Sequence, residues 1–274
     1  MIKVLITDKL AQEGIDLLNS MDGVEAVVKL KIGEDELAKI IGEYDGLIVR
    51  SDTKVTAKVL ANPGKLKGVA RAGVGIDNID VPAATRKGVI VMNTPGGNTL
   101  SAAEHTLALI LAMSRNVVPA CNSLKSEAWD RKKYMGNQLN GKVLGVIGLG
   151  RIGMAVAKMA KGFNMKVLGY DPLAAPADAE KSGVEVTTEL EKIFKESDYI
   201  TVHVPKNEQT LNMIGAEQIK MMKPNVRLVN CARGGIINED ALYSALAEKR
   251  IAGAALDVFP KEPPESFKFK EFES

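Results

Sequence analysis

The sequence is poor in cysteine, histidine and aromatic residues, and these shortages exclude several classes of protein. Its 274 residues include two cysteines and two histidines, and only 4% are aromatic. Cys121 and Cys231 lie far apart and form no metal or redox spacing, so we expect no metal site and a reduced, cytoplasmic protein. With so few rings, the cores must consist mostly of Val, Ile, Leu, Ala and Met.

An excess of one charge and long apolar runs are also missing. Lys and Arg number 36 against 34 Asp and Glu, so we expect neither a nucleic-acid nor a membrane partner. The longest helical apolar run, residues 106–113, is too short to span a bilayer. Charged residues interrupt residues 1–20, which therefore do not resemble a signal peptide.

Apolar strands alternate with amphipathic helices along the whole chain, which predicts an α/β fold on parallel sheets. A Gly- and Pro-rich linker at 94–98 separates a domain of residues 1–94 from one of residues 95–274. In the first domain we expect strands at 2–7, 24–30, 46–50, 68–72 and 89–93 and helices at 10–21, 34–42 and 55–61. In the second we expect strands at 143–147, 166–170, 184–186, 199–204, 226–232 and 253–259, alternating with helices.

One long helix is predicted to open the second domain. Ser101 and Glu104 have the spacing of a capping box, which predicts a helix over residues 102–118. Pro119 should then kink or break it.

The most informative segment is a strand followed by Gly148-x-Gly150-x-x-Gly153 and a helix beginning at Arg151. A second strand ends at Asp171, where a ribose-binding acid is expected. The glycines permit a tight turn and close approach to a pyrophosphate, which predicts a dinucleotide site. A carboxylate without a neighbouring Arg favours NAD over NADP. The alternatives are a glycine-rich turn without ligand and an ordinary turn Asp.

Other polar residues also follow predicted strands, where ligands collect in open α/β sheets. Arg233, in Asn230-Cys-Ala-Arg-Gly-Gly235, can hold a carboxylate with two donors, or be a surface ion-pair partner. Asp257 and Glu262 follow another strand, and each taken alone reads as a solvated loop acid.

The first domain and the two histidines offer further candidates. Arg50 and Arg71 end two strands beside glycine-rich backbone, which would suit an anionic substrate. His105 reads as a packing or interface residue. His203 reads as a neighbour of the adenine side of the cofactor, with an acid/base group as the alternative.

Together these motifs resemble the D-2-hydroxyacid dehydrogenase family, most closely its phosphoglycerate dehydrogenase branch. The resemblance covers essentially the whole chain. The matching segments are residues 46–51, 71–78, 83–88, 92–95, 129–134, 140–142, 148–153, 169–172, 230–235 and 254–259.

The resemblance implies a Rossmann-type doubly wound parallel sheet, plus a smaller flavodoxin-like α/β substrate domain. It implies an NAD-dependent enzyme that removes hydride from C2 of a small 2-hydroxy acid. In the phosphoglycerate branch the substrate is phosphorylated: 3-phosphoglycerate becomes 3-phosphohydroxypyruvate at the start of serine biosynthesis.

Residue roles follow from position in the family motifs. Arg233 matches the catalytic arginine, which binds the carboxylate and carbonyl oxygen, and Glu262 matches the acid that pairs with a catalytic histidine. The expected cofactor contacts are Gly148, Gly150, Arg151, Ile152, Gly153, Asp171, Val74, Val204, Cys231, Ala232 and Asp257. The expected substrate contacts are Arg50, Ser51, Arg71 and Gly73.

The family's catalytic histidine follows Glu262 in a Thr-Pro-His-type loop, whereas this sequence ends at Ser274. We therefore expect the second domain to lack its last strand and the C-terminal return helix, and turnover to be slow. The alternatives are an NAD(H)-binding interaction protein without turnover, a fragment of an ordinary enzyme, or a dehydrogenase acting on glyoxylate, hydroxypyruvate or D-lactate.

A homodimer through residues 101–134 is also expected. In the family such a segment forms an arm through which two subunits embrace. The apolar residues that motivate this are Leu107, Leu109, Ile110, Leu111 and Trp129. The alternative is that they pack inside their own subunit.

Overall fold

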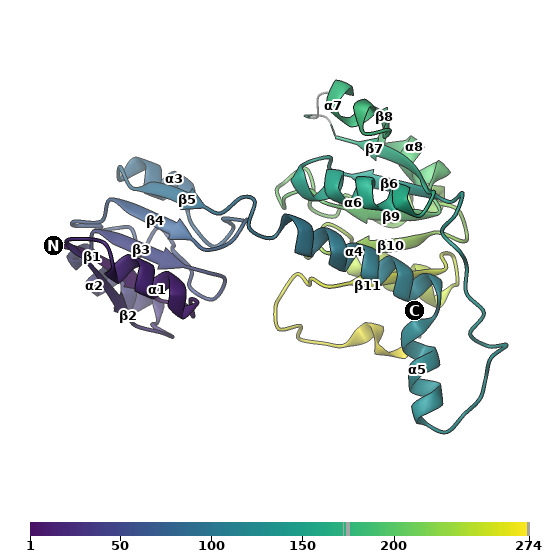
Figure 1. Ribbon diagram of the computed structural model, residues 1–274, viewed down its shortest axis with the longest axis horizontal. Helices are drawn as coiled ribbons and strands as arrows, with labels where there is room; N and C mark the ends of the chain where they lie inside the picture. The colour runs from purple at the N-terminus through teal and green to yellow at the C-terminus, as the bar shows by residue number, and fades with distance from the viewer. Residues whose placement is uncertain (172, 174–175, 273–274) are drawn as a thin grey trace. The chain divides into compact units, whose positions relative to one another are not determined.

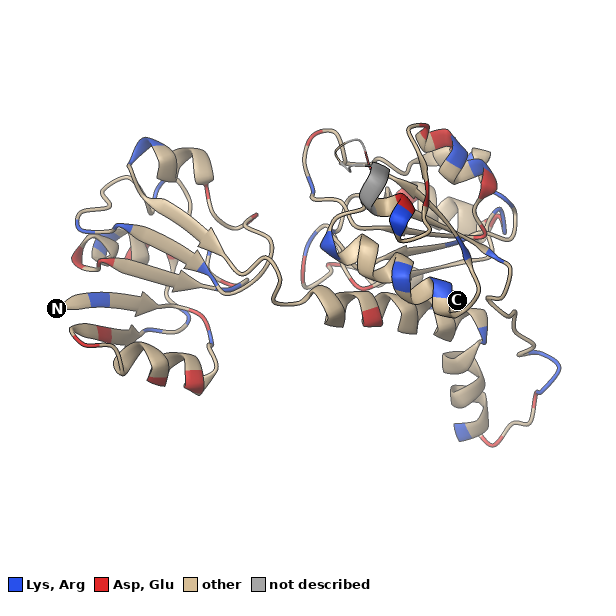
Figure 2. Cartoon of the chain, turned by 45° about the horizontal axis from the view of Figure 1, so that its top comes forward, with Lys and Arg blue, Asp and Glu red and all other residues tan. Residues whose placement is uncertain are grey.

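The computed structural model describes residues 1–171, 173 and 176–272, and the chain divides into two compact units, residues 1–98 and 99–274. Both units are α/β (Figure 1). Acidic and basic residues are interspersed over each of them (Figure 2).

The first unit is a parallel sheet in the order β2-β1-β3-β4-β5. This is the flavodoxin-like strand order. Its strands are β1 (Ile2–Ile6), β2 (Val24–Val28), β3 (Gly46–Val49), β4 (Gly68–Arg71) and β5 (Ile90–Asn93), and its helices are α1 (Gln12–Asn19), α2 (Glu34–Ile40), the short 3₁₀ turn η1 (Ile41–Glu43) and α3 (Val81–Arg86).

One expected helix of the first unit, residues 55–61, is wrong. Val55 instead forms an isolated bridge with Ile79, and turns follow it. Val55, Val59 and Leu60 are fully buried, so their helix-like spacing reflects inward-facing positions of an irregular segment. The helix α3 was not expected; Asp80 caps it by accepting the Ala83 amide at 2.9 Å.

The second unit is a parallel sheet in the order β11-β10-β9-β6-β7-β8. This is the Rossmann order, in which successive strands are added first on one side of β6 and then, from β9 on, on its other side. Its strands are β6 (Val143–Ile147), β7 (Lys166–Tyr170), β8 (Glu185–Thr187), β9 (Tyr199–Val202), β10 (Arg227–Asn230) and β11 (Gly253–Leu256). Its helices are α4 (Thr99–Ser114), α5 (Val117–Lys125), α6 (Arg151–Gly162), α7 (Pro176–Lys181), α8 (Leu190–Glu196), α9 (Ala216–Met221), α10 (Glu239–Ala247) and the 3₁₀ turn η2 (Lys268–Glu271).

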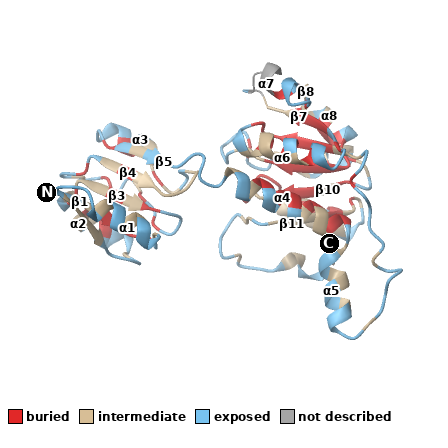
Figure 3. Cartoon of the chain, in the orientation of Figure 1, coloured by how far each residue is buried: buried red, intermediate tan, exposed pale blue. Residues whose placement is uncertain are grey.

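Side chains of this second sheet alternate between two cores. Leu144 and Val146 face a cluster with α4 and α6, whereas Ile147 and Val202 face a cluster with α8, α9 and α10. The central strands are therefore buried on both faces, as Figure 3 shows. This explains why they read as continuous apolar runs in the sequence.

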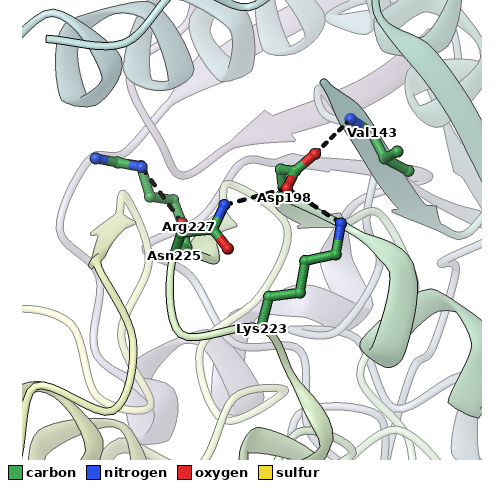
Figure 4. A network of polar contacts seen from close by, with 5 residues as sticks. All are labelled: Val143, Asp198, Lys223, Asn225 and Arg227. Carbon is green, nitrogen blue, oxygen red and sulfur yellow. Dashed lines mark hydrogen bonds and ion pairs between the residues drawn. The ribbon is translucent and has the colours of Figure 1, made fainter. Parts of the chain in front are cut away.

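A buried carboxylate joins three strands at the amino end of this sheet (Figure 4). Asp198 accepts the Val143 amide at 2.8 Å and bonds from Lys223 and Asn225, each at 3.1 Å. Burial alone would raise the pKa of Asp198, but these donors outweigh it and lower the pKa. Because cofactors bind at the opposite, carboxyl end, this network serves the fold.

The start of the second unit differs from expectation. Helix α4 begins at Thr99, directly after Asn98, so Ser101 lies inside it and the predicted capping box is wrong. The helix breaks at Asn116, in left-handed conformation (φ 51°), and α5 follows at a 62° bend. The expected break near Pro119 is therefore found, three residues before it. Pro119 lies in the first turn of α5, where its missing N–H costs no bond, whereas in one continuous helix its ring would clash with the Arg115 carbonyl.

Within the described ranges, no individual helix has both the length and the apolar composition to cross a membrane. Only the bent pair α4 and α5, taken together, satisfies those two criteria.

Candidate cofactor and substrate sites

The three fingerprint glycines each meet a different spatial requirement. Gly148 has φ +95°, and a Cβ there would lie 2.7 Å from the His203 carbonyl oxygen. A Cβ on Gly153 would lie 1.9 Å from the Gly148 carbonyl oxygen, so helix and strand can approach only without side chains. A Cβ on Gly150 would meet nothing within 4 Å. The backbone at Gly150 thus faces open space that can receive a phosphate group.

Helix α6 begins directly at this open space. Gly150 is its N-cap, and the exposed Arg151 and partly buried Ile152 are its first residues. The first amides of a helix have no partner within it, and the dipole makes this end positive. Two amides and a positive end facing open space fit a pyrophosphate.

Asp171 couples the glycine loop to the end of β7. One carboxylate oxygen accepts the Leu149 amide at 2.9 Å, and the other accepts the Leu173 amide at 2.8 Å. Asp171 is therefore a turn acid as well as a candidate ribose ligand. Each oxygen keeps a second lone pair, so these bonds leave acceptor capacity for ribose hydroxyls.

Two loops at the carboxyl edge, after β10 and β11, are packed backbone against backbone. A Cβ on Gly234 would lie 1.9 Å from the Phe259 carbonyl carbon, and the Asp257 amide donates to the Asn230 carbonyl at 3.0 Å. The loop that carries Arg233 and the loop that carries Glu262 are consequently neighbours.

Each loop is also fixed by its own side chains. Asn230 donates to the Arg233 carbonyl at 2.9 Å and accepts the Ala232 amide at 3.0 Å. Arg233 donates to the Ala232 carbonyl at 2.7 Å. Glu262, which is exposed, accepts the Phe259 amide at 3.0 Å. The sequence did not single out Asn230 by itself, although an Asn at a buried strand end is a signal for such a loop.

His105 of α4 pairs with Asp257 after β11. The two groups lie 3.3 Å apart, and both side chains are about half exposed. The expectation that His105 is a packing or interface residue missed this pairing. Nearby, burial raises the pKa of the Cys231 thiol, with a hydrogen bond to Thr106 opposing the shift.

His203 lies against the first fingerprint glycine. Its amide donates to the Ile147 carbonyl at 2.7 Å, and its ring Nε2 lies 3.0 Å from the Thr201 hydroxyl. Burial lowers the pKa of His203 to about 4, so the ring is neutral at pH 7. The neighbouring Val204 would contact a Cβ on Gly148 at 3.0 Å, so Val204 lines the glycine turn.

The expected substrate residues of the first unit form one hydrogen-bonded group at its carboxyl edge. Arg71 donates to the Arg50 carbonyl at 3.1 Å, to the Ser51 hydroxyl at 3.2 Å and to the Gly75 carbonyl. The Gly73 amide donates to the Arg71 carbonyl at 2.8 Å. The strand ends of β3 and β4 are therefore joined.

Residues close to this group tie it to the rest of the unit. The Val74 carbonyl accepts from Asn93 at 2.6 Å. Asp8 and Asn78 hold the loop that bears Arg50. Sequence reasoning assigned no role to Asp8 or Asn78, although Asp8 follows the first strand as Asp171 follows β7.

Comparison with known proteins adds a family and several relatives. Residues 107–273 match the model of the D-isomer specific 2-hydroxyacid dehydrogenase, NAD binding domain. The chain is 50% identical over 264 residues to D-3-phosphoglycerate dehydrogenase of Methanocaldococcus jannaschii, covering 96% of this chain and 50% of that protein. It is 47% identical over 272 residues to D-3-phosphoglycerate dehydrogenase of Synechocystis, covering 99% and 49%. The chain thus spans about half the length of the curated relatives it matches.

A solved structure extends the comparison. The chain is similar to a D-lactate dehydrogenase from Aquifex aeolicus complexed with NAD and lactic acid, with a TM-score of 0.83 and 34% identity. The match covers 94% of this chain and 78% of that structure.

Proposed function

This chain belongs to the D-isomer specific 2-hydroxyacid dehydrogenase family, and we propose that it acts in the oxidation of 3-phosphoglycerate to 3-phosphohydroxypyruvate. The hydrogen at C2 leaves as hydride, and the hydroxyl proton passes to a base. The product would enter serine biosynthesis. The names of the relatives at 47–50% identity support this substrate.

NAD is the cofactor of the matched domain, and when bound it accepts the hydride. We assign its pyrophosphate to the open backbone at Gly150 and the amides of Arg151 and Ile152. The carboxylate of Asp171 accepts the ribose hydroxyls and repels a 2′-phosphate. Val204, Cys231, Ala232 and Asp257 line the same carboxyl edge, and we also assign Val74 to the cofactor from its position in the family motifs.

The substrate carboxylate is assigned to Arg233. A guanidinium can bind a carboxylate through two parallel hydrogen bonds, and the bonds from Asn230 on both sides of Arg233 keep its loop in one shape. Glu262 comes from the adjoining loop, and its position in the family motif assigns it to pair with the base that takes the hydroxyl proton.

The phosphate is assigned to the first unit. The observation that carries a phosphorylated substrate is the pair of arginines, Arg50 and Arg71, on hydrogen-bonded loops with the Ser51 hydroxyl. Arginine suits phosphate because its planar donors match the phosphate oxygens. Gly73 lies beside them, and its amide donates to the Arg71 carbonyl.

A substrate panel tests the assignment. NADH formation and ligand affinity by calorimetry would be measured with D-3-phosphoglycerate, D-glycerate and D-lactate. We expect D-3-phosphoglycerate to bind at least about tenfold more tightly than D-glycerate, since a charged hydrogen bond is worth roughly 1.5–3 kcal/mol. Arg50→Ala should remove that preference, whereas Arg233→Ala should weaken both ligands. Equal affinity for all three acids would show that the substrate is not phosphorylated.

The proposal includes a homodimer through residues 101–134 in the cytoplasm. Leu107 and Ile110 do not support the dimer, since both are buried in the core of their own unit. Exposed apolar side chains on α5 and the loop after it support it: Val117, Val118, Leu124 and Trp129 are 52–74% exposed. Cys121 and Cys231 are free thiols, which fits a reducing compartment.

A further inference from the structure

One buried carboxylate, that of Asp8, accepts hydrogen bonds from N–H and O–H groups of the loop of residues 50–53, after β3. Asp8 follows β1 and is 5% exposed. It accepts the amide of Arg50 at 2.5 Å and the amide of Thr53 at 3.2 Å. It also accepts the Thr53 hydroxyl at 2.5 Å. Three donors of one short loop thus converge on a single side chain.

One side-chain amide, that of Asn78, donates hydrogen bonds to backbone carbonyls of the same loop. Asn78 donates to the carbonyls of Arg50 and Thr53, both at 2.7 Å. Because both partners are carbonyls, the orientation of the Asn78 amide is fixed. The backbone amide and the carbonyl of both residue 50 and residue 53 are therefore bonded to side chains from two other loops.

This clamp determines where the anion-binding groups lie. The Arg50 carbonyl that Asn78 holds also accepts from Arg71 at 3.1 Å. Ser51, inside the clamped loop, accepts from the same guanidinium at 3.2 Å. If residues 50–53 shifted, Arg50, Ser51 and Arg71 would all change position.

We propose that Asp8 and Asn78 are positioning residues that preorganise Arg50, Ser51 and Arg71 for the phosphate of the substrate. This inference rests on the proposed function, since it takes the phosphorylated substrate from there. Neither side chain is assigned a contact with the ligand. They act through the shape of the 50–53 loop, and a group held in advance loses less entropy on binding.

The sign of one effect separates positioning from simple electrostatics. Asp8 is negative, so removing its charge would by itself favour an anion nearby. Loss of positioning has the opposite effect. An Asp8→Asn variant that binds the phosphorylated ligand more weakly would therefore show that the carboxylate acts through the loop.

The test compares Asp8→Asn with Asp45→Asn in the full chain. Asp45 also accepts a backbone amide, that of Lys3 at 2.9 Å, but at the amino end of the same sheet. Two further variants leave the charge unchanged: Thr53→Val removes the hydroxyl that donates to Asp8, and Thr53→Ser keeps it. D-3-phosphoglycerate and D-glycerate would be titrated into each NADH-loaded variant by calorimetry, and amide hydrogen exchange would be followed at Arg50 and Thr53.

We expect Asp8→Asn and Thr53→Val to bind D-3-phosphoglycerate about tenfold more weakly, with D-glycerate and NADH affinities unchanged. The amides of residues 50 and 53 should exchange faster in both, whereas Thr53→Ser and Asp45→Asn should resemble the unmodified chain. If Asp8→Asn binds as tightly as Asp45→Asn, the positioning role is wrong while the substrate stands. If the unmodified chain does not bind D-3-phosphoglycerate, the proposed substrate fails and the positioning role fails with it.

Discussion

Replacing Asp171 separates its two possible duties, holding the glycine loop and binding ribose. Its carboxylate accepts the Leu149 amide at 2.9 Å and the Leu173 amide at 2.8 Å. Asp171→Ala removes both bonds and the charge, whereas Asp171→Asn keeps one amide oxygen as acceptor and removes the charge. The pair therefore distinguishes loss of loop support from loss of charge.

The magnitudes follow from these bonds. A hydrogen bond to a charged group is worth roughly 1.5–3 kcal/mol, about a 10- to 100-fold change in affinity. Asp171→Ala should weaken NADH by at least this factor, since the Leu149 amide in the glycine loop also loses its partner. The affinity for NADPH should fall less, because losing the charge removes repulsion of the 2′-phosphate. Asp171→Asn should also reduce the preference for NADH over NADPH, but its affinity for NADH should fall less than that of Asp171→Ala.

Nucleotide fluorescence titrations with NADH and NADPH would measure both affinities. The unmodified chain should prefer NADH. Asp198→Asn is a suitable control, because it removes a carboxylate at the opposite end of the same sheet and should leave the NADH to NADPH ratio unchanged. If Asp171→Ala weakens both nucleotides by the same factor, Asp171 acts only through the loop and the ribose assignment is wrong.

Four further outcomes are expected. The pKa of His203 falls from 6.5 to about 4 on folding, so the unfolding free energy should be highest above pH 6.5 and fall by up to about 3 kcal/mol as the pH drops to 4. Chemical denaturation should show this fall in the unmodified chain and not in His203→Gln, and equal pH profiles for the two would contradict the burial argument. Asp198→Ala should lower the unfolding free energy at pH 7 by roughly 1.5–3 kcal/mol or more. Because folding lowers the pKa of Asp198, its stabilisation is present above the pKa of the unfolded state and lost as the pH falls through the pKa of the folded state, so the difference in unfolding free energy between variant and unmodified chain should disappear in acid. Gly150→Ala should leave the melting temperature unchanged, because its Cβ meets nothing within 4 Å. It should lower the affinity for NADH in titrations, and an unchanged affinity would argue against a pyrophosphate at Gly150. Sedimentation at micromolar concentration should give a dimer mass that Trp129→Glu reduces, and a folded monomer would count against the interface at 101–134.

The sequence by itself determined the type and order of most elements. Apolar runs such as Val143–Ile147 are local signals, because a strand buried on both faces must be apolar at each position. The glycine fingerprint is equally local, since Gly148 needs its left-handed φ and Gly153 its missing side chain in one short turn. The family, the NAD-binding domain and the parallel α/β class followed from such segments and are confirmed.

Tertiary structure alone decided which side chains meet. His105 and Asp257 are 152 positions apart and pair only because α4 packs beside β11. Asp8 and Asn78 reach the loop at Arg50 because the order β2-β1-β3-β4-β5 places the ends of β1 and β4 on either side of β3. The break between α4 and α5 was predicted from Pro119, which cannot continue a helix, and the structure decided only its exact place, at the left-handed Asn116. Periodicity reports which face of an element is buried, whereas hydrogen-bond partners between loops depend on strand order, which no local pattern encodes.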